Sequence, residues 1–287
     1  IRAKEVMISS GSIERPIVFG NNDTPGVMLS SAAKEYLKVY GVLVGRNPLI
    51  FTNNDSGYET AIEFKKNGVN SIILDTRKDP KSEIIDEAKN LGIKIKFSYV
   101  VVAAKGYKKV KSADIAKISN NKEELGKVEN ISCDCICVSG FWTPTIHLAS
   151  QSGNKTKFKE DIDAFIPGVS KQNETTLGAA NGSFTLTETL KSSFEAGYEL
   201  SKKITKNDNM ISFPNVVEKK STVHDKFWCV PLPKGKTYKR FLDFQNDVAV
   251  SDIELALREG FRSIEHVKRY TTLGMATDQG KTSNLNG

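Results

Sequence analysis

Two stretches of small and hydroxyl-bearing residues have the chemistry that holds phosphate groups. Residues 177 to 186 predict a strand, a turn of small residues and a helix that starts near Thr185. The start of such a helix aims backbone N–H groups at an anion, and Thr185 would then be a phosphate ligand. The same pattern also fits a plain helix cap, and both interpretations remain open.

The second stretch is the tail from Thr271 to Asn284, which is dense in hydroxyls, amides and glycines. Loops of this kind bind phosphate through backbone N–H groups and side-chain hydroxyls. The tail is not a complete P-loop, because it contains Gly280-Lys-Thr282 but has Met275 where the first glycine should be. A solvated loop without a ligand is the alternative interpretation.

Residues 47 to 77 form the clearest strand-helix-strand unit of the chain. Asp75 ends its second strand, where a dinucleotide-binding fold places the carboxylate that holds a ribose hydroxyl. The glycine fingerprint of such folds is absent, because Asn53 and Asp55 occupy its first two glycine positions. Asp55 would also set a negative charge near the phosphates. We therefore expect a nucleotide-binding fold with a degenerate phosphate site, and whether it binds a dinucleotide stays open.

No residue pattern indicates a catalytic acid, base or nucleophile, or a metal site. The chain has three histidines, at positions 147, 224 and 266. None is grouped with a serine, a cysteine or a metal-like cluster, so we expect them to be structural. Cys133, Cys135 and Cys137 alternate with a period of two, which on a strand would point all three thiols to one face as small hydrophobes. A metal site would favour C-x-x-C loops instead.

The elements that must position these residues are organised by two Ser-Gly turns, Ser10-Gly11 and Ser139-Gly140. Each ends a short apolar run and is followed by a proline, which predicts a strand that stops and turns sharply. The block between the turns has its own strand and helix pattern, so we predict an α/β fold of two nested nucleotide-binding domains. The first would comprise residues 1–45 and 127–205 with its N-terminal part missing, the inserted second 46–126, and a connector with a helical segment 206–287.

Apolar spacing predicts the individual helices and strands. Helices are expected over residues 27–40, 58–67, 81–91, 251–260 and 263–270, and strands over 2–9, 49–51, 71–75, 93–104, 108–119 and 132–138. Residues 158–167 predict an edge hairpin, and residues 207–236 an irregular connector. Ser251 to Glu254 predict a capping box at the start of the fourth helix.

The bulk composition sets limits on the class of protein. The 287 residues suffice for about two domains. The net charge of +7 comes from scattered lysines without a nucleic-acid motif, so we expect no nucleic-acid partner. No apolar run has the length of a membrane span. Few cysteines and no secretory leader favour the cytoplasm, although the chain begins with Ile1 and so has the character of a fragment.

Several motifs together resemble the alpha subunit of heterotetrameric sarcosine oxidases. They are the Ser-Gly turn with Glu14-Arg-Pro16, the Phe51–Asp55 turn, Ser139–Pro144 and His147–Gly153. The tail adds Asp243–Val248, Glu259–His266, Arg269–Thr272 and Asp278–Asn284. The resemblance covers essentially the whole chain and is most specific in the tail.

The resemblance implies a pyridine nucleotide-disulfide oxidoreductase-like fold and an oxidative demethylase. In that family sarcosine is oxidised at FAD in the beta subunit, and electrons pass to FMN near the alpha-beta boundary and then to O2. Tetrahydrofolate takes the imine carbon in an aminomethyltransferase-like domain of alpha. The products are glycine, hydrogen peroxide and methylene-tetrahydrofolate or formaldehyde. The chain would be the middle of alpha, without that folate domain, in a heterotetramer with beta, gamma and delta subunits.

The resemblance also implies where cofactors would bind. It places NAD at Ser10, Gly11, Gly178, Ala179 and Thr185. Ala179 stands where related enzymes often carry Asp, which weakens that contact. It places the FMN phosphate at Lys268, Arg269, Thr271, Thr272, Gln279, Lys281 and Thr282. Arginine and lysine there would neutralise the phosphate charge.

Two alternatives stay open beside this interpretation. One is a subunit of a sister flavoenzyme that acts on another amine, such as an opine, proline or glycine. The other is a non-catalytic nucleotide-binding scaffold that stabilises its partner, which Asn53 and Asp55 favour.

Overall fold

A computed structural model describes residues 3–205, 212–213, 216 and 224–287. The chain forms two compact units, which are described separately below. Unit 1 comprises residues 1–13 and 142–219, and unit 2 comprises residues 14–141 and 220–287.

The centre of unit 2 is a five-stranded parallel sheet with the order β3-β10-β4-β5-β6. Its strands are β3 (Val27–Leu29), β4 (Pro48–Thr52), β5 (Ile72–Asp75), β6 (Lys94–Phe97) and β10 (Cys135–Ser139). Every residue of β4 and β10 is buried, as expected for central parallel strands covered on both faces.

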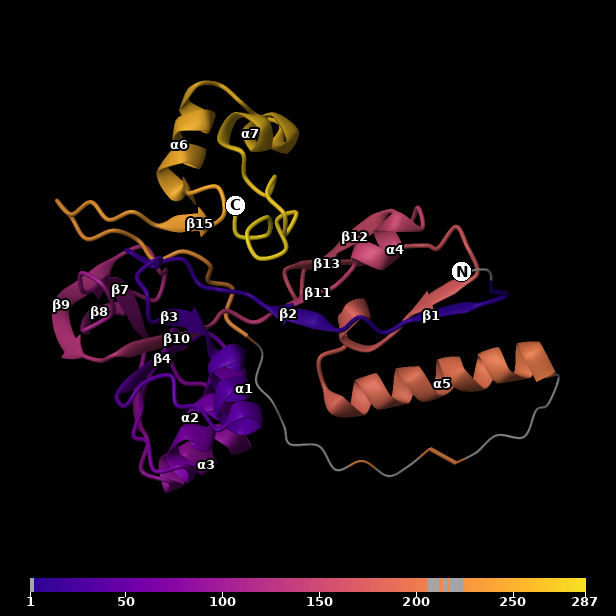
Figure 1. Cartoon of the computed structure of the whole chain (residues 1–287), viewed down its shortest axis with the longest axis horizontal. Coiled ribbons are helices and arrows are strands. Elements are labelled where there is room, and N and C mark those ends of the chain that lie inside the picture. Colours follow the sequence, from indigo (N-terminus) through magenta and orange to yellow (C-terminus); the bar gives the residue numbers. More distant parts are fainter. Residues whose placement is uncertain (1–2, 206–211, 214–215, 217–223) are drawn as a thin grey trace. The chain divides into compact units, whose positions relative to one another are not determined.

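Three helices cover one face of this sheet: α1 (Ser30–Tyr40), α2 (Ser56–Lys66) and α3 (Glu83–Asn90) (Figure 1). Their apolar stripes pack on the sheet through a core that contains Tyr58, Phe64, Ile50 and Ile73. α1 ends at Gly41, whose φ of 66° lies in the left-handed region that glycine adopts without strain. The strand-helix-strand unit predicted for residues 47–77 is present.

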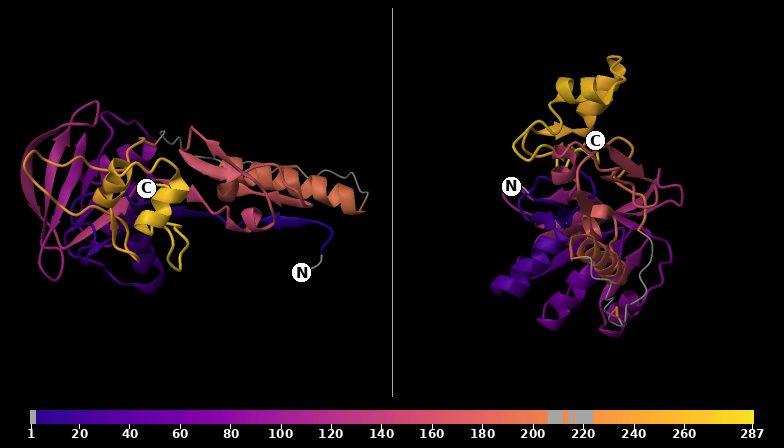
Figure 2. Two further views of the ribbon diagram at one scale, coloured as in Figure 1. Left: turned by 90° about the horizontal axis from the view of Figure 1, so that it is seen from above. Right: turned by 90° about the vertical axis from the view of Figure 1, so that its right-hand side faces the viewer.

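A three-stranded antiparallel sheet covers the other face, as Figures 1 and 2 show. Its strands are β7 (Tyr99–Lys105), β8 (Ser112–Ile118) and β9 (Leu125–Ser132). Val101 and Ile115 of this sheet pack with Leu49, Phe51 and Leu74 in a second core cluster. Both faces of the parallel sheet are therefore dry.

The boundaries of unit 2 differ from the 46–126 expected for the inserted domain. The strand β3 and the helix α1 were expected in the first domain, and the stretch over 132–138 was expected to return the chain to it. Instead, β3 and β4 both hydrogen-bond to β10 within one sheet. Apolar runs show that strands exist, but they do not say which strand lies beside which.

Unit 2 also contains the C-terminal segment. A short hairpin of β15 (Phe241–Asp243) and β16 (Val248–Ala249) leads into α6 (Val250–Arg258) and α7 (Ile264–Thr271). Leu242, Val248 and Leu273 form its core with Val18. The predicted capping box at Ser251–Glu254 is not the cap: the N-cap is Ala249, whose N–H donates to Asp252 Oδ2 at 2.8 Å, and the alanine side chain cannot accept the reciprocal hydrogen bond.

Unit 1 is built from short strands and one long helix. β1 (Val6–Ile8) pairs in parallel with β14 (Glu174–Thr176). β2 (Ser12–Glu14) lies beside β11 (Trp142–Pro144), and β12 (Thr156–Lys159) pairs antiparallel with β13 (Ala164–Pro167) as the predicted hairpin. The helices are α4 (His147–Gln151), a 3₁₀ turn η1 (Gly178–Asn181) and α5 (Leu186–Thr205).

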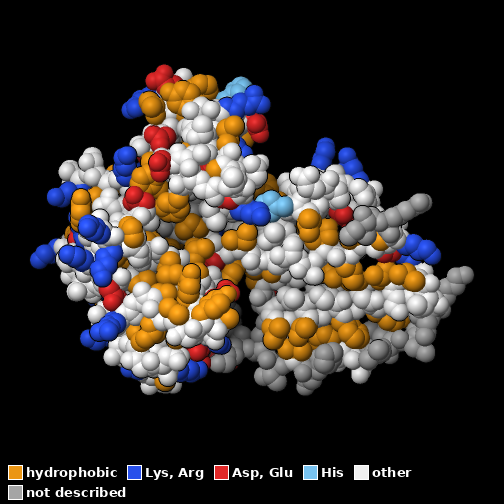
Figure 3. Space-filling model, viewed as in Figure 1, with side chains coloured by type: hydrophobic (Ala, Val, Ile, Leu, Met, Phe, Trp, Pro, Cys, Tyr) orange, Lys and Arg blue, Asp and Glu red, His pale blue; other side chains and the backbone are white. Residues whose placement is uncertain are grey.

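The long helix α5 has no buried residue, although it has an apolar stripe. Figure 3 shows rows of hydrophobic side chains on this unit. Leu186 on α5 is 60% exposed and Val6 on β1 is 45% exposed. Much of the predicted connector lies outside the described residues, but its part from His224 onward belongs to unit 2.

Candidate nucleotide-binding sites

The carboxyl edge of the parallel sheet in unit 2 is where ligands of such folds bind. Thr52, Asp75 and Ser139 end three adjacent strands there and lie in register. The turn after Thr52 carries Asn53 and Asp55 in place of glycines, as the sequence showed.

Arg77 joins two buried carboxylates at this edge. Its Nη2 donates to Asp75 Oδ2 at 2.8 Å and its Nη1 to Asp55 Oδ1 at 2.8 Å. The Tyr58 hydroxyl also donates to Asp75 Oδ2, at 2.7 Å. Asp75 is fully buried and Arg77 is 8% exposed. Burial raises the pKa of Asp75, while the hydrogen bonds and charge of Arg77 act in the opposite direction.

This network leaves the Asp75 carboxylate without capacity for a ribose. It already accepts the Tyr58 hydroxyl and the Arg77 backbone N–H, Nε and Nη2 donors. Two carboxylate oxygens offer about four acceptor positions in total. A ribose hydroxyl would therefore have to displace an internal partner.

A later part of the chain covers the same edge. The Asp225 N–H donates to the Asn53 carbonyl at 2.8 Å, and Asn53 Nδ2 donates back to the Asp225 carbonyl at 2.8 Å. Thr76 Oγ1 donates to the Asp225 carboxylate at 2.9 Å, and Lys122 forms an ion pair with it. Residues 224–230, here called the covering segment, thus lie where a dinucleotide would be expected.

The starts of the two helices at this edge are also occupied by side-chain oxygens. Glu14 Oε2 accepts the Ser31 N–H at 2.7 Å in the first turn of α1, and burial raises the pKa of Glu14. Asn54 Oδ1 accepts the Ser56 N–H at 2.8 Å at the start of α2. These N–H groups are the ones that would otherwise bind an anion. The residues of this edge do not fit a dinucleotide.

Unit 1 holds the five residues that the resemblance places around NAD. Ser10 and Gly11 follow β1, and Gly178 and Ala179 follow β14, so both pairs lie just beyond the carboxyl ends of two adjacent parallel strands. The Leu177 N–H donates to the Ile8 carbonyl at 2.9 Å, which extends the pairing to this point.

Two of these five residues have local roles at the start of α5. Gly178 has a φ of 61°, and a Cβ there would lie 3.0 Å from Thr189 Cγ2. Thr185 Oγ1 accepts the Glu188 N–H at 3.3 Å, so Thr185 caps the start of α5 as expected.

The seven tail residues that the resemblance places around the FMN phosphate all lie in unit 2. They occupy the last turn and C-cap of α7, and the turns that follow: Lys268, Arg269, Thr271, Thr272, Gln279, Lys281 and Thr282. In the described part of the chain, none of the three cations forms a salt bridge.

The backbone N–H groups of the tail are less available to a phosphate than the sequence predicts. The Gly280 N–H donates to Asp278 Oδ1 at 3.1 Å, and the Gly274 N–H donates to the buried Asp243 carboxylate at 2.8 Å. Thr271 Oγ1 donates to the Val267 carbonyl at 2.8 Å. These groups are therefore occupied within the tail and its neighbours, whereas the half-buried Lys268 and the exposed Arg269 and Lys281 carry positive charge without a salt bridge among the described residues.

An apolar cavity of about 220 Å³ adjoins the tail. It is lined by Pro16, Ile17, Phe19, Asn22, Val27, Met28, Leu29, Val138, Phe244 and Thr282. Thr282 is one of the seven tail residues, and the cavity lies at the ends of β3 and β10. It places apolar surface beside the turn that carries Lys281 and Thr282.

Three cysteines and one histidine of unit 2 pack against other side chains. Cys135 and Cys137 share one core cluster with their sulfurs 3.7 Å apart, but Cys133 precedes β10 and packs in the other cluster. The expectation of three thiols on one face is therefore corrected. The His224 ring stacks on Phe141 with centroids 3.8 Å apart. Among the described residues, no group of three possible metal ligands is found.

Comparison with known proteins identifies relatives of the chain. Residues 237–287 match the model of the sarcosine oxidase A3 domain. The chain is 37% identical over its whole length to the sarcosine oxidase subunit alpha of Rhizobium meliloti (strain 1021), and 32% identical over 99% of its length to that of Corynebacterium sp. (strain P-1). This chain is homologous along its length to sarcosine oxidase alpha subunits. It spans 28% and 30% of those two relatives.

Solved structures confirm the fold class. The L-proline dehydrogenase of P. horikoshii matches 99% of this chain with a TM-score of 0.64 and 20% identity, over 52% of its own chain. The thioredoxin reductase of T. acidophilum matches 66% of this chain with a TM-score of 0.52 and 17% identity, over 61% of its own chain. The described part of the chain contains no helix both long and apolar enough to cross a membrane.

Sequence reasoning missed the residues that close the edge in unit 2. They are Glu14, Tyr58, Arg77 and Asp225. One signal was present: an acid at position 55 needs a buried cation, and Arg77 follows Asp75 by two residues. No local pattern announces Asp225, which is 172 residues from Asn53.

Proposed function

We propose that this chain is part of the alpha subunit of a flavin-dependent sarcosine oxidase. The whole enzyme would convert sarcosine, O2 and tetrahydrofolate to glycine, hydrogen peroxide and methylene-tetrahydrofolate, with sarcosine oxidised at FAD in a beta subunit and gamma and delta subunits completing the heterotetramer. The observation that carries the proposal is the 37% identity to a sarcosine oxidase subunit alpha over all of this chain.

In this proposal unit 1 contributes to NAD binding. Ser10, Gly11, Gly178 and Ala179 lie at the ends of β1 and β14, and Thr185 lies at the start of α5. The role proposed for these residues is to bind and orient the cofactor.

The tail would help to hold FMN, which accepts electrons when it is bound. Lys268, Arg269 and Lys281 would neutralise the phosphate, with Thr271, Thr272, Gln279 and Thr282 as neutral hydrogen-bond partners. The apolar cavity beside Thr282 would exclude water from its neighbourhood. Unit 2 would otherwise act as a scaffold, since its own nucleotide edge is filled by Asp55, Arg77 and Asp225.

One observation favours a second candidate, a sister amine dehydrogenase. The fold of almost the whole chain is shared with an L-proline dehydrogenase. The substrate of the assembly therefore needs to be measured, with sarcosine and proline compared as sources of electrons for O2 uptake.

The test uses the full-length alpha chain co-expressed with its partner subunits. The purified assembly is denatured, and the released nucleotides are identified by mass spectrometry. We expect NAD together with FMN. Finding FAD but neither NAD nor FMN, or finding proline oxidised and sarcosine untouched, would overturn the proposal.

Two matched variants test the tail. Lys281→Gln should weaken FMN retention about tenfold, because one charge-assisted contact to phosphate is lost. Lys127→Gln removes an exposed lysine of β9 and should leave FMN content unchanged. Equal FMN content in the two variants would show that Lys281 does not help to bind the FMN phosphate.

A further inference from the structure

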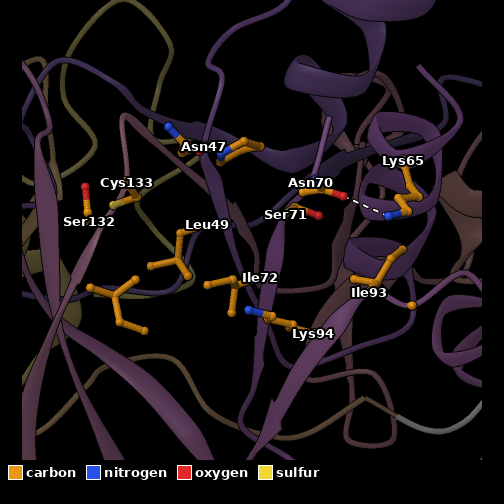
Figure 4. A pocket seen from close by; sticks show the side chains of 13 residues that line it. Asn47, Leu49, Lys65, Asn70, Ser71, Ile72, Ile93, Lys94, Ser132 and Cys133 are labelled. Carbon is orange, nitrogen blue, oxygen red and sulfur yellow. Dashed lines mark hydrogen bonds between the residues drawn. The ribbon is translucent and has the colours of Figure 1, made fainter. Parts of the chain in front are cut away.

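A second cavity lies at the amino ends of the parallel strands, opposite the edge described above. Its volume is about 360 Å³, and Figure 4 shows the side chains that line it. They are Asn47, Pro48, Leu49, Lys65, Asn70, Ser71, Ile72, Gly92, Ile93, Lys94, Ile131, Ser132 and Cys133. No residue assigned above to NAD or FMN is among them.

One side of this cavity is apolar and is built by the register of the sheet. Leu49 on β4 pairs with Ile72 on β5, and Ile72 pairs with Lys94 on β6. The three residues form one row across adjacent strands, and Figure 4 shows Lys94 beside Ile72. The row therefore runs from a hydrocarbon surface to an ammonium group.

The polar side of the cavity carries cations and no acid. Lys65 and Lys94 line it, and Lys65 Nζ donates to Asn70 Oδ1 at 2.8 Å. None of the described lining residues is Asp or Glu. A cationic ligand would find no counter-charge here, whereas an anion would find two.

A buried hydroxyl at the same place lacks a partner. Ser71 is 6% exposed, and its Oγ has no hydrogen-bond partner among the described residues. Buried polar groups are nearly always satisfied, by protein, by water or by a ligand. This oxygen is closed off from solvent, so it lies beneath the wall of the cavity and is not among the groups that would contact a ligand.

We propose that this cavity binds a small organic carboxylate with a branched apolar body. The carboxylate would lie against Lys94, and the hydrocarbon part would lie on Leu49 and Ile72 of the same row. Lys65 would add positive charge to the same cavity. The cavity combines an apolar wall with polar and cationic side chains, the kind of mixed lining that small-molecule sites have.

The test is isothermal titration calorimetry on the purified full-length assembly with 4-methylpentanoate as the probe. We expect saturable binding, at least tenfold tighter than that of the neutral 4-methylpentanamide and tighter than that of inorganic phosphate. Lys94→Gln should raise the dissociation constant about five- to tenfold, because it removes one charged partner.

Matched controls separate the site from general charge effects. Lys96→Gln on the same strand removes a lysine outside the cavity that pairs with Glu129, and it should leave the dissociation constant unchanged. Lys65→Gln and its neighbour control Lys66→Gln form a second pair. Equal binding of the acid and the amide, equal effects of the paired variants, or a crystal structure grown with the probe in which the cavity holds water alone would each overturn the proposal.

Discussion

Asp55, Tyr58, Asp75 and Arg77 form a buried polar network in which each charge has a partner. Arg77 bridges both carboxylates at 2.8 Å. Breaking a buried ion pair by removing one partner destabilises strongly, because a charge is left without compensation in a medium of low polarity. In dinucleotide-binding folds the carboxylate at this strand end usually binds a ligand, whereas here Asp75 contributes to the stability of the chain.

The first prediction concerns Arg77. Arg77→Met should lower the free energy of unfolding by about 3 kcal/mol, because two buried carboxylates lose their cation. Tyr58→Phe should lower it by only about 1 kcal/mol, because it removes one hydrogen bond. Urea denaturation followed by circular dichroism measures both values. Arg46→Met, at an exposed position, is the control, and a loss for Arg77→Met no larger than for this control contradicts the network's role.

The second prediction concerns the buried thiol of Cys133 and the dependence of folding stability on pH. Burial raises the pKa of Cys133 from 9.0 to about 12. The unfolded chain therefore releases the proton at lower pH than the folded chain, so the thiol's contribution to stability is full below pH 9 and is lost as pH rises toward 12.

Wild type and Cys133→Ala make this contribution measurable. The stability advantage of wild type over the variant should narrow by about 1 kcal/mol between pH 8 and pH 10, since one pKa unit corresponds to about 1.4 kcal/mol and partial solvation reduces the effect. Urea titrations at several pH values give the difference. A constant difference over this range would mean that the folded thiol ionises as the unfolded one does.

At the scale of elements, local sequence predicts what long-range pairing cannot. The helices α2 and α3 and the strands β4 and β5 follow from apolar spacing and from Gly68 and Gly92, which end the helical patterns. The neighbours of β10 do not follow, because hydrogen bonding to β3 and β4 joins residues about 90 to 110 apart in the chain.

Contacts between residues far apart in the sequence also limited what could be predicted about the candidate nucleotide-binding sites. The position of Asp75 at a strand end could be predicted, but its fourfold hydrogen bonding could not, because Arg77 and Tyr58 come from different elements. The covering segment reaches Asn53 from more than 170 residues away. The sequence shows that the phosphate-binding turn lacks its glycines, because Asn53 and Asp55 stand in their place. Only the structure shows that Asp55 pairs with Arg77 and that Asn53 binds the covering segment.

The covering segment gives the prediction at this scale. Asp225→Ala removes the hydrogen bond from Thr76 and the ion pair with Lys122. Amide hydrogens of residues 225–230 should then exchange about tenfold faster, because local opening becomes easier by about 1.4 kcal/mol. Hydrogen-deuterium exchange with mass spectrometry measures the rate. Asp79→Ala removes an exposed carboxylate and is the control, and equal exchange in both variants would show that Asp225 does not hold the segment.

At the scale of the whole molecule, the exposed apolar surface matters most. In unit 1, β1 and β14 form only a two-stranded parallel sheet, and α5 buries no side chain. Parallel strands are normally found in larger sheets covered on both faces. The chain spans 28% of its relative from Rhizobium meliloti (strain 1021), so these surfaces are ones that further protein could cover.

Unit 2 has its own exposed apolar patch at the end of α1. Val39 and Tyr40 are each 66% exposed, and Tyr36, Val42 and Leu43 beside them are 46%, 48% and 44% exposed. Contiguous apolar surface of this kind drives association when nothing covers it. The 287-residue chain expressed alone should therefore sediment above its mass of 31.7 kDa as concentration rises.

The double variant Val39→Lys and Tyr40→Lys should reduce this association, because two charges must lose water when the patch is buried. Sedimentation velocity at several concentrations compares the variant with wild type and with Glu35→Lys and Lys38→Glu, a charge-exchanged control on the same helix. If only the first variant returns toward 31.7 kDa, the α1 patch is the surface that associates. If it associates as strongly as wild type, the contact lies elsewhere, and the apolar face of α5 and β1 becomes the surface to alter next.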